Sequence, residues 1–152
     1  MADQVKPVPD GYHTATPYLI VKGAAKAIEF YKQAFGATEL ERMETPDGKI
    51  AHAEIRIGDS IIMLGDGAPQ RGRHSTHPSG STSCGLYLYV EDVDETFNRA
   101  VTAGATVTME VKDQFYGDRN GSLVDPFGHT WYVATRKENL SMDEIRQRLP
   151  AA

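Results

Sequence analysis

The first half of the chain changes its hydrophobic period from that of a strand to that of a helix and back. Residues 16–21, TPYLIV, form a β-rich run, which is typical of a strand. Apolar residues then recur at helical spacing from Ala24 to Phe35, and Gly36 ends the expected helix. Further strands are expected at three runs separated by turn residues: 38–43, 50–57 and 60–64. This half therefore predicts a strand, a helix and three strands.

The second half repeats the same order of elements. A strand is expected at 85–90, and a helix with an apolar stripe follows it and ends at Gly104. After the helix we expect a strand at 106–111, a loop around QFYGDRNG, a short strand near 122–124 and a last strand at 129–135. The helix-ending segments FGAT and AGAT fall at nearly the same offset in the two halves. The sequence therefore predicts an internal duplication.

Together these patterns predict a single α+β domain of two tandem βαβββ modules that form a curved mixed sheet around a cavity. The first module is expected at about residues 14–64 and the second at about 84–135. Residues 65–83 are rich in Gly, Pro and Ser, and we expect them to form a mobile linker. A capping-box pattern predicts a C-terminal helix at about 141–149.

Strand alternation sorts the side chains of each strand onto two faces. The aliphatic face is expected to pack on the helices, as for Leu86 and Leu88, which leaves Tyr87 and Tyr89 on the other face. The same rule gives an aromatic-rich concave wall made of Tyr18, His52, Glu54, Met63, Tyr87, Tyr89 and Tyr132. Such a wall with few polar groups is typical of a small-molecule site. The alternative is that the tyrosines are amphipathic packing with their hydroxyls in water.

Two groups of residues are candidates for chemistry at this wall. His52 and Glu54 lie two positions apart and face the same side, so they form either a catalytic acid–base pair or a structural hydrogen-bonded contact. The segment FYGDR places Phe115, Tyr116, Asp118 and Arg119 in a loop where aromatic faces and a charged fork can hold a ligand. An Asp118–Arg119 pair that only shapes this loop is the alternative.

Composition and charge exclude several classes of partner. The net charge is −5 and basic residues are not clustered, so neither nucleic acid nor an acidic membrane surface is expected as a partner. The chain has no long apolar run, and its first residues lack the pattern of a signal peptide. We therefore expect a cytoplasmic protein. The single cysteine, Cys84, cannot form an internal disulfide.

The linker contains a His-x-x-His pair, His74 and His77, which invites a metal assignment. A flexible loop without carboxylates gives a poor fixed geometry for a metal ion. We therefore expect both histidines to lie in a solvated loop.

Four segments cover nearly the whole chain from Thr16 to Thr135 and carry a resemblance to known proteins. They are TPYLIVKGAAKAIEFYKQAFGA, AHAEIRIGDSIIML, LYLYVEDVDETFNRAVTAGA and FYGDRNGSLVDPFGHTWYVAT, and the most specific motif among them is DPFGH-x-W. These segments resemble the vicinal oxygen chelate superfamily, which includes glyoxalase I, bleomycin-resistance proteins and extradiol dioxygenases. The chain looks most similar to a glyoxalase-like branch with proteins similar to PhnB. The resemblance implies paired βαβββ modules, a homodimer, and pockets formed between modules or chains.

The metal enzymes of this superfamily carry His or Gln, Glu, His and Glu on the first and last strand of each half. Matched strand to strand, those positions fall on Thr16, Met63, Gly85 and Tyr132. This set offers neither the charge nor the donor geometry that a divalent ion needs. We therefore expect no metal there and no cofactor. The alternative is a divalent metal at another site, made by His52, Glu54 and either His13 or His129.

Two functions follow from these observations. The preferred hypothesis is a metal-free protein that binds or sequesters a small aromatic molecule between its modules, as bleomycin-resistance proteins do. The rival is an enzyme of lyase, isomerase or dioxygenase type that uses a non-standard metal site or His52 and Glu54 as acid and base.

Overall fold

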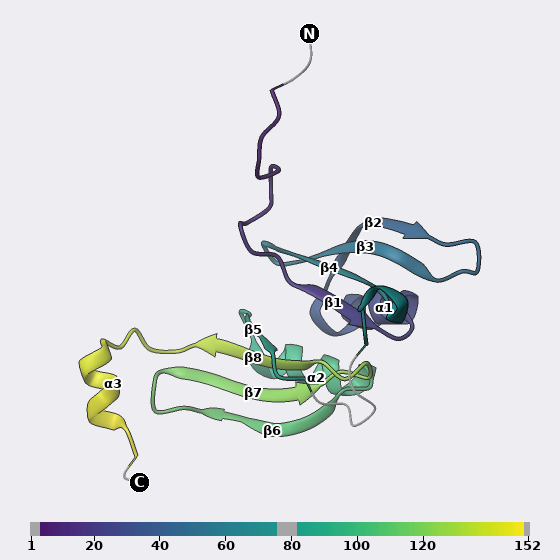
Figure 1. The fold of residues 1–152 in the computed structure, drawn as a ribbon. Coiled ribbons are helices and arrows are strands. Elements are labelled where there is room, and N and C mark those ends of the chain that lie inside the picture. The colour runs from purple at the N-terminus through teal and green to yellow at the C-terminus, as the bar shows by residue number, and fades with distance from the viewer. Residues whose placement is uncertain (1–3, 76–81, 151–152) are drawn as a thin grey trace. The chain divides into compact units, whose positions relative to one another are not determined.

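The computed structural model describes residues 4–75 and 82–150 (Figure 1). It is an α+β structure with two four-stranded mixed sheets and three α-helices. The chain divides into two compact units at about Ser75, and each contains one sheet. None of the helices in the described part of the chain is long and apolar enough to cross a membrane.

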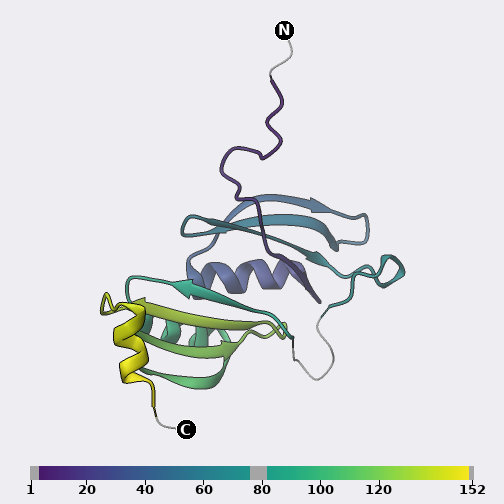
Figure 2. The same cartoon turned by 60° about the vertical axis from the view of Figure 1, so that its left-hand side comes forward.

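The first unit follows the predicted order of a strand, a helix and three strands. Its elements are β1 (Tyr18–Val21), α1 (Ala24–Phe35), β2 (Thr38–Glu44), β3 (Ile50–Ile57) and β4 (Ser60–Asp66). The strands pair in the order β1-β4-β3-β2, and only the β1–β4 pair is parallel. Figure 2 shows α1 running along one face of this sheet.

The second unit repeats this topology, as the duplication predicts. Its elements are β5 (Gly85–Tyr89), α2 (Val93–Ala103), β6 (Thr106–Asp113), β7 (Asp118–Val124) and β8 (Thr130–Arg136). The strand order is β5-β8-β7-β6, again with a single parallel pair between the first and last strands. A terminal helix, α3 (Met142–Arg148), follows, with Ser141 as its N-cap.

The predicted division of each sheet into two faces holds for the residues that form the cores. Leu19 and Val21 of β1 and Trp131 and Val133 of β8 are buried, whereas Tyr132 between the last two is exposed. Burial of such aliphatic and aromatic side chains is the main force that holds each sheet against its helix. The opposite face of each sheet is therefore the one available for a site.

Asp66, the last residue of β4, joins three segments of the first unit. Its Oδ1 accepts hydrogen bonds from the backbone N–H groups of Gly23 (2.9 Å) and Ala24 (3.2 Å) at the start of α1. Its Oδ2 accepts from the N–H of Ile50 in β3 (2.7 Å). One carboxylate thus satisfies donors that the helix start would otherwise leave unpaired.

The segment expected to be a linker is partly structured. Strand β4 continues to Asp66, and a 3-10 turn, Pro69–Arg71, is closed by a bridge between Ala68 and Arg73. His74 is exposed, and His77 lies outside the described residues.

A second difference from the sequence expectation concerns residues 118–121. They were expected in a loop, but they belong to β7, which begins at Asp118. Polar and glycine residues predict a loop here. Pairing with β8 on one side and β6 on the other overrides that local preference.

Candidate functional site

The second sheet exposes three tyrosine rings on the face opposite its core. Tyr87 and Tyr89 alternate with Leu86 and Leu88 along β5, and Tyr132 of β8 pairs directly with Tyr87. The ring centroids of Tyr87 and Tyr132 lie 5.9 Å apart with the planes tilted by 18°, and those of Tyr87 and Tyr89 lie 5.1 Å apart. These side chains are 42%, 58% and 39% exposed in the order Tyr87, Tyr89, Tyr132. We call these three residues the tyrosine platform.

Two polar side chains of β7 form hydrogen bonds to tyrosine hydroxyls of the platform. The carboxylate of Asp118, which is only 5% exposed, accepts hydrogen bonds from the hydroxyls of Tyr87 (2.8 Å) and Tyr89 (3.0 Å). The amide of Asn120 donates to the hydroxyls of Tyr87 (2.8 Å) and Tyr116 (2.7 Å). Tyr87 and Tyr89 are therefore fixed by a connected hydrogen-bond network rather than by packing alone.

The surroundings of Tyr87 also raise the pKa of its phenol. Partial burial raises the pKa of its phenol, and although the bond from Asn120 lowers it, the neighbouring Asp118 carboxylate raises it further. The phenol therefore keeps its proton to a higher pH than an ordinary tyrosine does. The guanidinium of Arg136 lies over the Tyr89 ring at 5.7 Å, with its Nε 3.7 Å from Asp118 Oδ1, and balances the buried carboxylate.

The alternative in which Asp118 pairs with Arg119 is wrong. Arg119 donates instead to both carboxylate oxygens of Asp94 on α2 (2.9 and 3.0 Å) and to Asp113 (3.3 Å). Because neighbouring residues of a strand face opposite sides, Arg119 lies on the helix side of β7 and Asp118 on the platform side. The Arg119 guanidinium holds the pKa of the Asp94 carboxyl below its usual value.

The aromatic residues of the FYGDR segment lie in or next to the hydrogen-bond network. Tyr116 enters the network through Asn120, and Phe115 packs edge-on against Tyr116 with their centroids 5.2 Å apart.

An open pocket of about 450 Å³ lies at this β6–β7 turn, and none of its lining residues is a platform tyrosine. Its lining residues are Asp113, Gln114, Gly117, Asp118, Arg119, Lys137 and Glu138.

The first sheet carries the second candidate group, on β3. The ring nitrogen Nε2 of His52 lies 2.8 Å from Glu54 Oε2, and the other ring nitrogen, Nδ1, lies 3.1 Å from the Tyr18 hydroxyl. Glu54 is 6% exposed, and its second oxygen accepts a hydrogen bond from the Tyr12 hydroxyl. The structure thus brings His52, Glu54 and Tyr18 together as expected, and adds Tyr12.

The carboxyl of Glu54 is held in its ionised form. Burial by itself raises its pKa, but the hydrogen bonds from Tyr12 and His52 and the charge of His52 outweigh burial, so that the pKa lies below its usual value. The same bond raises the pKa of the Tyr12 phenol. The buried charge is thus compensated by donors on both of its oxygens.

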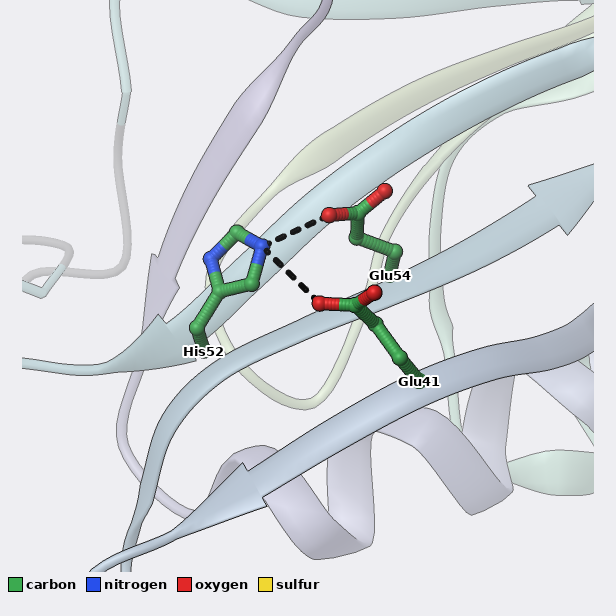
Figure 3. A group of neighbouring side chains, drawn as sticks. All are labelled: Glu41, His52 and Glu54. Carbon is green, nitrogen blue, oxygen red and sulfur yellow. Dashed lines mark hydrogen bonds and ion pairs between the residues drawn. The ribbon is translucent and has the colours of Figure 1, made fainter. Parts of the chain in front are cut away.

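Glu41 of β2 completes a group of three donors with His52 and Glu54 (Figure 3). Its Oε1 lies 4.0 Å from His52 Nε2, and the three ligand atoms all lie within 4.8 Å of one another. The alternative metal site derived from the sequence had His13 or His129 as its third member, and that alternative is corrected. His13 is exposed, whereas His129 lies in the turn before β8 with its backbone N–H bonded to Asp125.

The turn DPFGH-x-W has a structural role. The carboxylate of Asp125 accepts hydrogen bonds from the N–H groups of Phe127 (2.9 Å) and His129 (3.0 Å) and from the indole of Trp131 (2.8 Å). Because Asp125 and Trp131 are both buried, this carboxylate anchors the turn to the core of the second unit.

A family model for the Glyoxalase/Bleomycin resistance protein/Dioxygenase superfamily matches residues 12–133. The chain belongs to this superfamily. Uncharacterized protein Mb0911c of Mycobacterium bovis is 46% identical over 134 residues, which cover 86% of this chain and 88% of that protein.

Solved structures of the superfamily fold are also similar. A gene product of Arabidopsis thaliana is 28% identical with a TM-score of 0.66, covering 81% of this chain and 98% of that one. The fosfomycin resistance protein FosX of Listeria monocytogenes is 17% identical with a TM-score of 0.67, covering 88% and 97%. The likeness to FosX shows the fold alone.

The positions that hold metal in the superfamily's metal enzymes do not fit a metal here. They carry Thr16, Met63, Gly85 and Tyr132, which offer no imidazole or carboxylate donor. A Cβ atom at Gly85 would lie 2.7 Å from Cε2 of Tyr132. Two of the four positions are therefore packed against each other, and a ligand side chain at Gly85 requires the Tyr132 ring to move.

Sequence reasoning missed Asn120, Glu41 and Tyr12. Asn120 was hidden by the assignment of residues 118–121 to a loop. Glu41 depends on an irregular register between β2 and β3, and Tyr12 lies outside every strand and helix. Only the three-dimensional pairing brings these residues to their sites.

Proposed function

We propose that this protein binds a small aromatic molecule that stacks on the tyrosine platform. The observation that carries the proposal is that the rings are exposed while the hydroxyls of Tyr87 and Tyr89 are already bound to Asp118. Exposed aromatic side chains with satisfied polar atoms have ring faces as their remaining binding feature. The alternative, that these tyrosines only pack within the fold, is less well supported, because such packing would bury their rings.

The way the platform is held also favours binding. Ordering flexible side chains on association costs about 0.5–1.5 kcal/mol for each side chain. The hydrogen bonds to Asp118 and Asn120 fix the rings of Tyr87 and Tyr89 before a ligand arrives, so for these two side chains the cost is already met in folding. Phe115 and Tyr116 remain proposed contacts of this ligand, and Tyr18 and Met63 remain proposed ligand contacts on the first sheet. Arg119 lies on the opposite face of β7 with its guanidinium bound to Asp94, so it does not contact a ligand on the platform.

Equilibrium titration calorimetry against flavins, quinones, indoles and planar antibiotics tests this proposal. We expect saturable 1:1 binding of at least one planar class, weakened about five-fold or more in Tyr132→Ala, in line with the ~1–3 kcal/mol measured for stacking of a base on an aromatic residue. Absence of binding across the panel would contradict the proposal. We further propose that the protein is a cytoplasmic homodimer, and sedimentation velocity tests the dimer.

A second candidate function is acid–base catalysis of the lyase, isomerase or dioxygenase type at His52. The observation that favours it is the 2.8 Å contact between His52 Nε2 and a buried, ionised carboxylate, an arrangement that orients an imidazole for proton transfer. Turnover of a bound ligand that is lost in His52→Asn, with ligand affinity retained, supports this function. Binding without turnover supports the first proposal alone.

A further inference from the structure

Three potential metal donors converge on one side of the first sheet, at residues other than those matched to the metal ligands of the superfamily's metal enzymes. They are one imidazole nitrogen and two carboxylate oxygens, from His52, Glu54 and Glu41 (Figure 3). His52 and Glu54 share a face of β3 because they lie two residues apart. Glu41 comes from the neighbouring strand and is well exposed, with 58% of its side chain accessible.

The strand register places two negative charges directly opposite each other. Glu41 pairs with Glu54 across the β2–β3 ladder, and like charges at directly opposed positions destabilise a sheet. Within residues 4–75 and 82–150, His52 is the only basic side chain that pairs with either carboxylate. Arg42 is engaged on β2 by Glu39 and Glu44. The site therefore has an excess of negative charge that a bound cation would neutralise.

A local irregularity of β2 directs Glu41 to this position. The pairing skips one residue between Glu39 and Glu41, so that Glu41 rather than Leu40 lies opposite Glu54. Irregularities of this kind re-aim side chains and are frequent beside functional sites.

The second unit shows that the donors are not a requirement of the fold. The same skip occurs between Val107 and Met109 of β6, and it places Met109 opposite Ser122. There the site holds a thioether and a hydroxyl where the first unit holds two carboxylates. The duplicated backbone geometry is therefore shared, and the metal donors are specific to the first unit.

Two tyrosine hydroxyls bind the donor atoms that would face away from an ion. Tyr18 lies 3.1 Å from Nδ1 of His52, and Tyr12 donates to Oε1 of Glu54. Metal-binding histidines and carboxylates are oriented in this way by a second hydrogen-bonding partner. His52 Nε2 and Glu54 Oε2 are thereby directed to one point.

We propose that Glu41, His52 and Glu54 bind a first-row divalent transition-metal ion. Donors bound about 2.1 Å from a common ion lie roughly 3.0–3.4 Å apart. The separations from His52 Nε2, 2.8 Å to Glu54 and 4.0 Å to Glu41, bracket that range, and the exposed Glu41 side chain is free to adjust.

An imidazole with two carboxylates suits zinc, cobalt, manganese or iron and disfavours magnesium and calcium, which take oxygen ligands alone. Three protein ligands leave coordination positions open for a small molecule. This proposal is independent of ligand stacking on the platform.

Calorimetric titration of chelator-treated full-length protein with Zn²⁺, together with the absorption spectrum of added Co²⁺, tests the site. We expect 1:1 binding that millimolar Mg²⁺ does not displace. Glu41→Gln and His52→Asn should each weaken Zn²⁺ binding at least ten-fold. Because Glu41 is exposed, its variant should keep the wild-type circular dichroism spectrum, so that a loss of binding cannot be a loss of folding.

Two controls separate this site from other sources of binding. Glu44→Gln removes a negative charge from the same strand and should leave the affinity unchanged. Replacement of both His74 and His77 by alanine should also leave it unchanged. The proposal is overturned if Zn²⁺ does not bind stoichiometrically, if Glu41→Gln and His52→Asn bind as the wild type does, or if the His74 and His77 replacement abolishes binding.

Discussion

The hydroxyl of Tyr87 donates a 2.8 Å hydrogen bond to the buried carboxylate of Asp118, which lies 31 residues later in the chain. The two residues come from β5 and β7, which are separated in the sheet by β8. This contact ties an exposed aromatic ring to the interior of the second unit. It is the reason why the platform is both accessible and fixed.

Removing the Asp118 carboxylate should destabilise the second unit and loosen the platform. In Asp118→Ala the hydroxyls of Tyr87 and Tyr89 lose their acceptor, and unsatisfied partly buried polar groups cost about 1–3 kcal/mol. Urea denaturation should therefore show a lower midpoint, with a free energy of unfolding reduced by about 1–3 kcal/mol. Asp113→Ala, which removes an exposed carboxylate from the adjacent strand, should change the midpoint little; an equal loss in both variants would argue against a special role for Asp118.

The pKa of Tyr87 predicts a loss of stability in alkaline solution. Its folded-state pKa is raised, so the folded protein keeps this proton after the unfolded chain has released it at about pH 10. The contribution of Tyr87 is therefore fully present below that pH and declines as the pH rises above it. Denaturation midpoints measured from pH 8 to 11 should fall more steeply for the wild type than for Tyr87→Phe. Parallel curves would contradict the assignment.

The close approach of Gly85 and Tyr132 predicts a coupled substitution. A Cβ at position 85 would lie 2.7 Å from the Tyr132 ring, so Gly85→Ala should displace that ring and cost about 1–3 kcal/mol as overpacking does. In a Tyr132→Ala background the same substitution should cost much less. A double-mutant cycle measured by urea denaturation checks this coupling. Additive effects would mean that the ring does not limit position 85.

The sequence predicted the elements and the faces of the sheets, because both depend on local periodicity. Tyr87 and Tyr89 were placed on the outward face by alternation with Leu86 and Leu88. The polar side chains that bond to these tyrosines were harder to predict from the sequence. The run DRNG has the composition of a turn, and its pairing with residues 133–136 of β8 and with β6 makes it a strand.

The candidate metal donors show the same limit. His52 and Glu54 were recognised from their spacing on one strand. Glu41 belongs to another strand, and a regular ladder would have placed Leu40 there instead. A one-residue irregularity in a long-range pairing leaves no clear local signal in the sequence.

The central claim is that the platform binds ligands through its ring faces, and Tyr89 tests it most directly because it is the most exposed of the three rings. Binding of the tightest planar ligand should be measured by calorimetry for the wild type, Tyr89→Phe and Tyr89→Ala. We predict that Tyr89→Phe keeps the affinity within about two-fold, whereas Tyr89→Ala loses five-fold or more, as expected for the loss of ~1–3 kcal/mol of stacking. An affinity that falls equally in both variants would assign recognition to the hydroxyl, and one that changes in neither would place the ligand elsewhere.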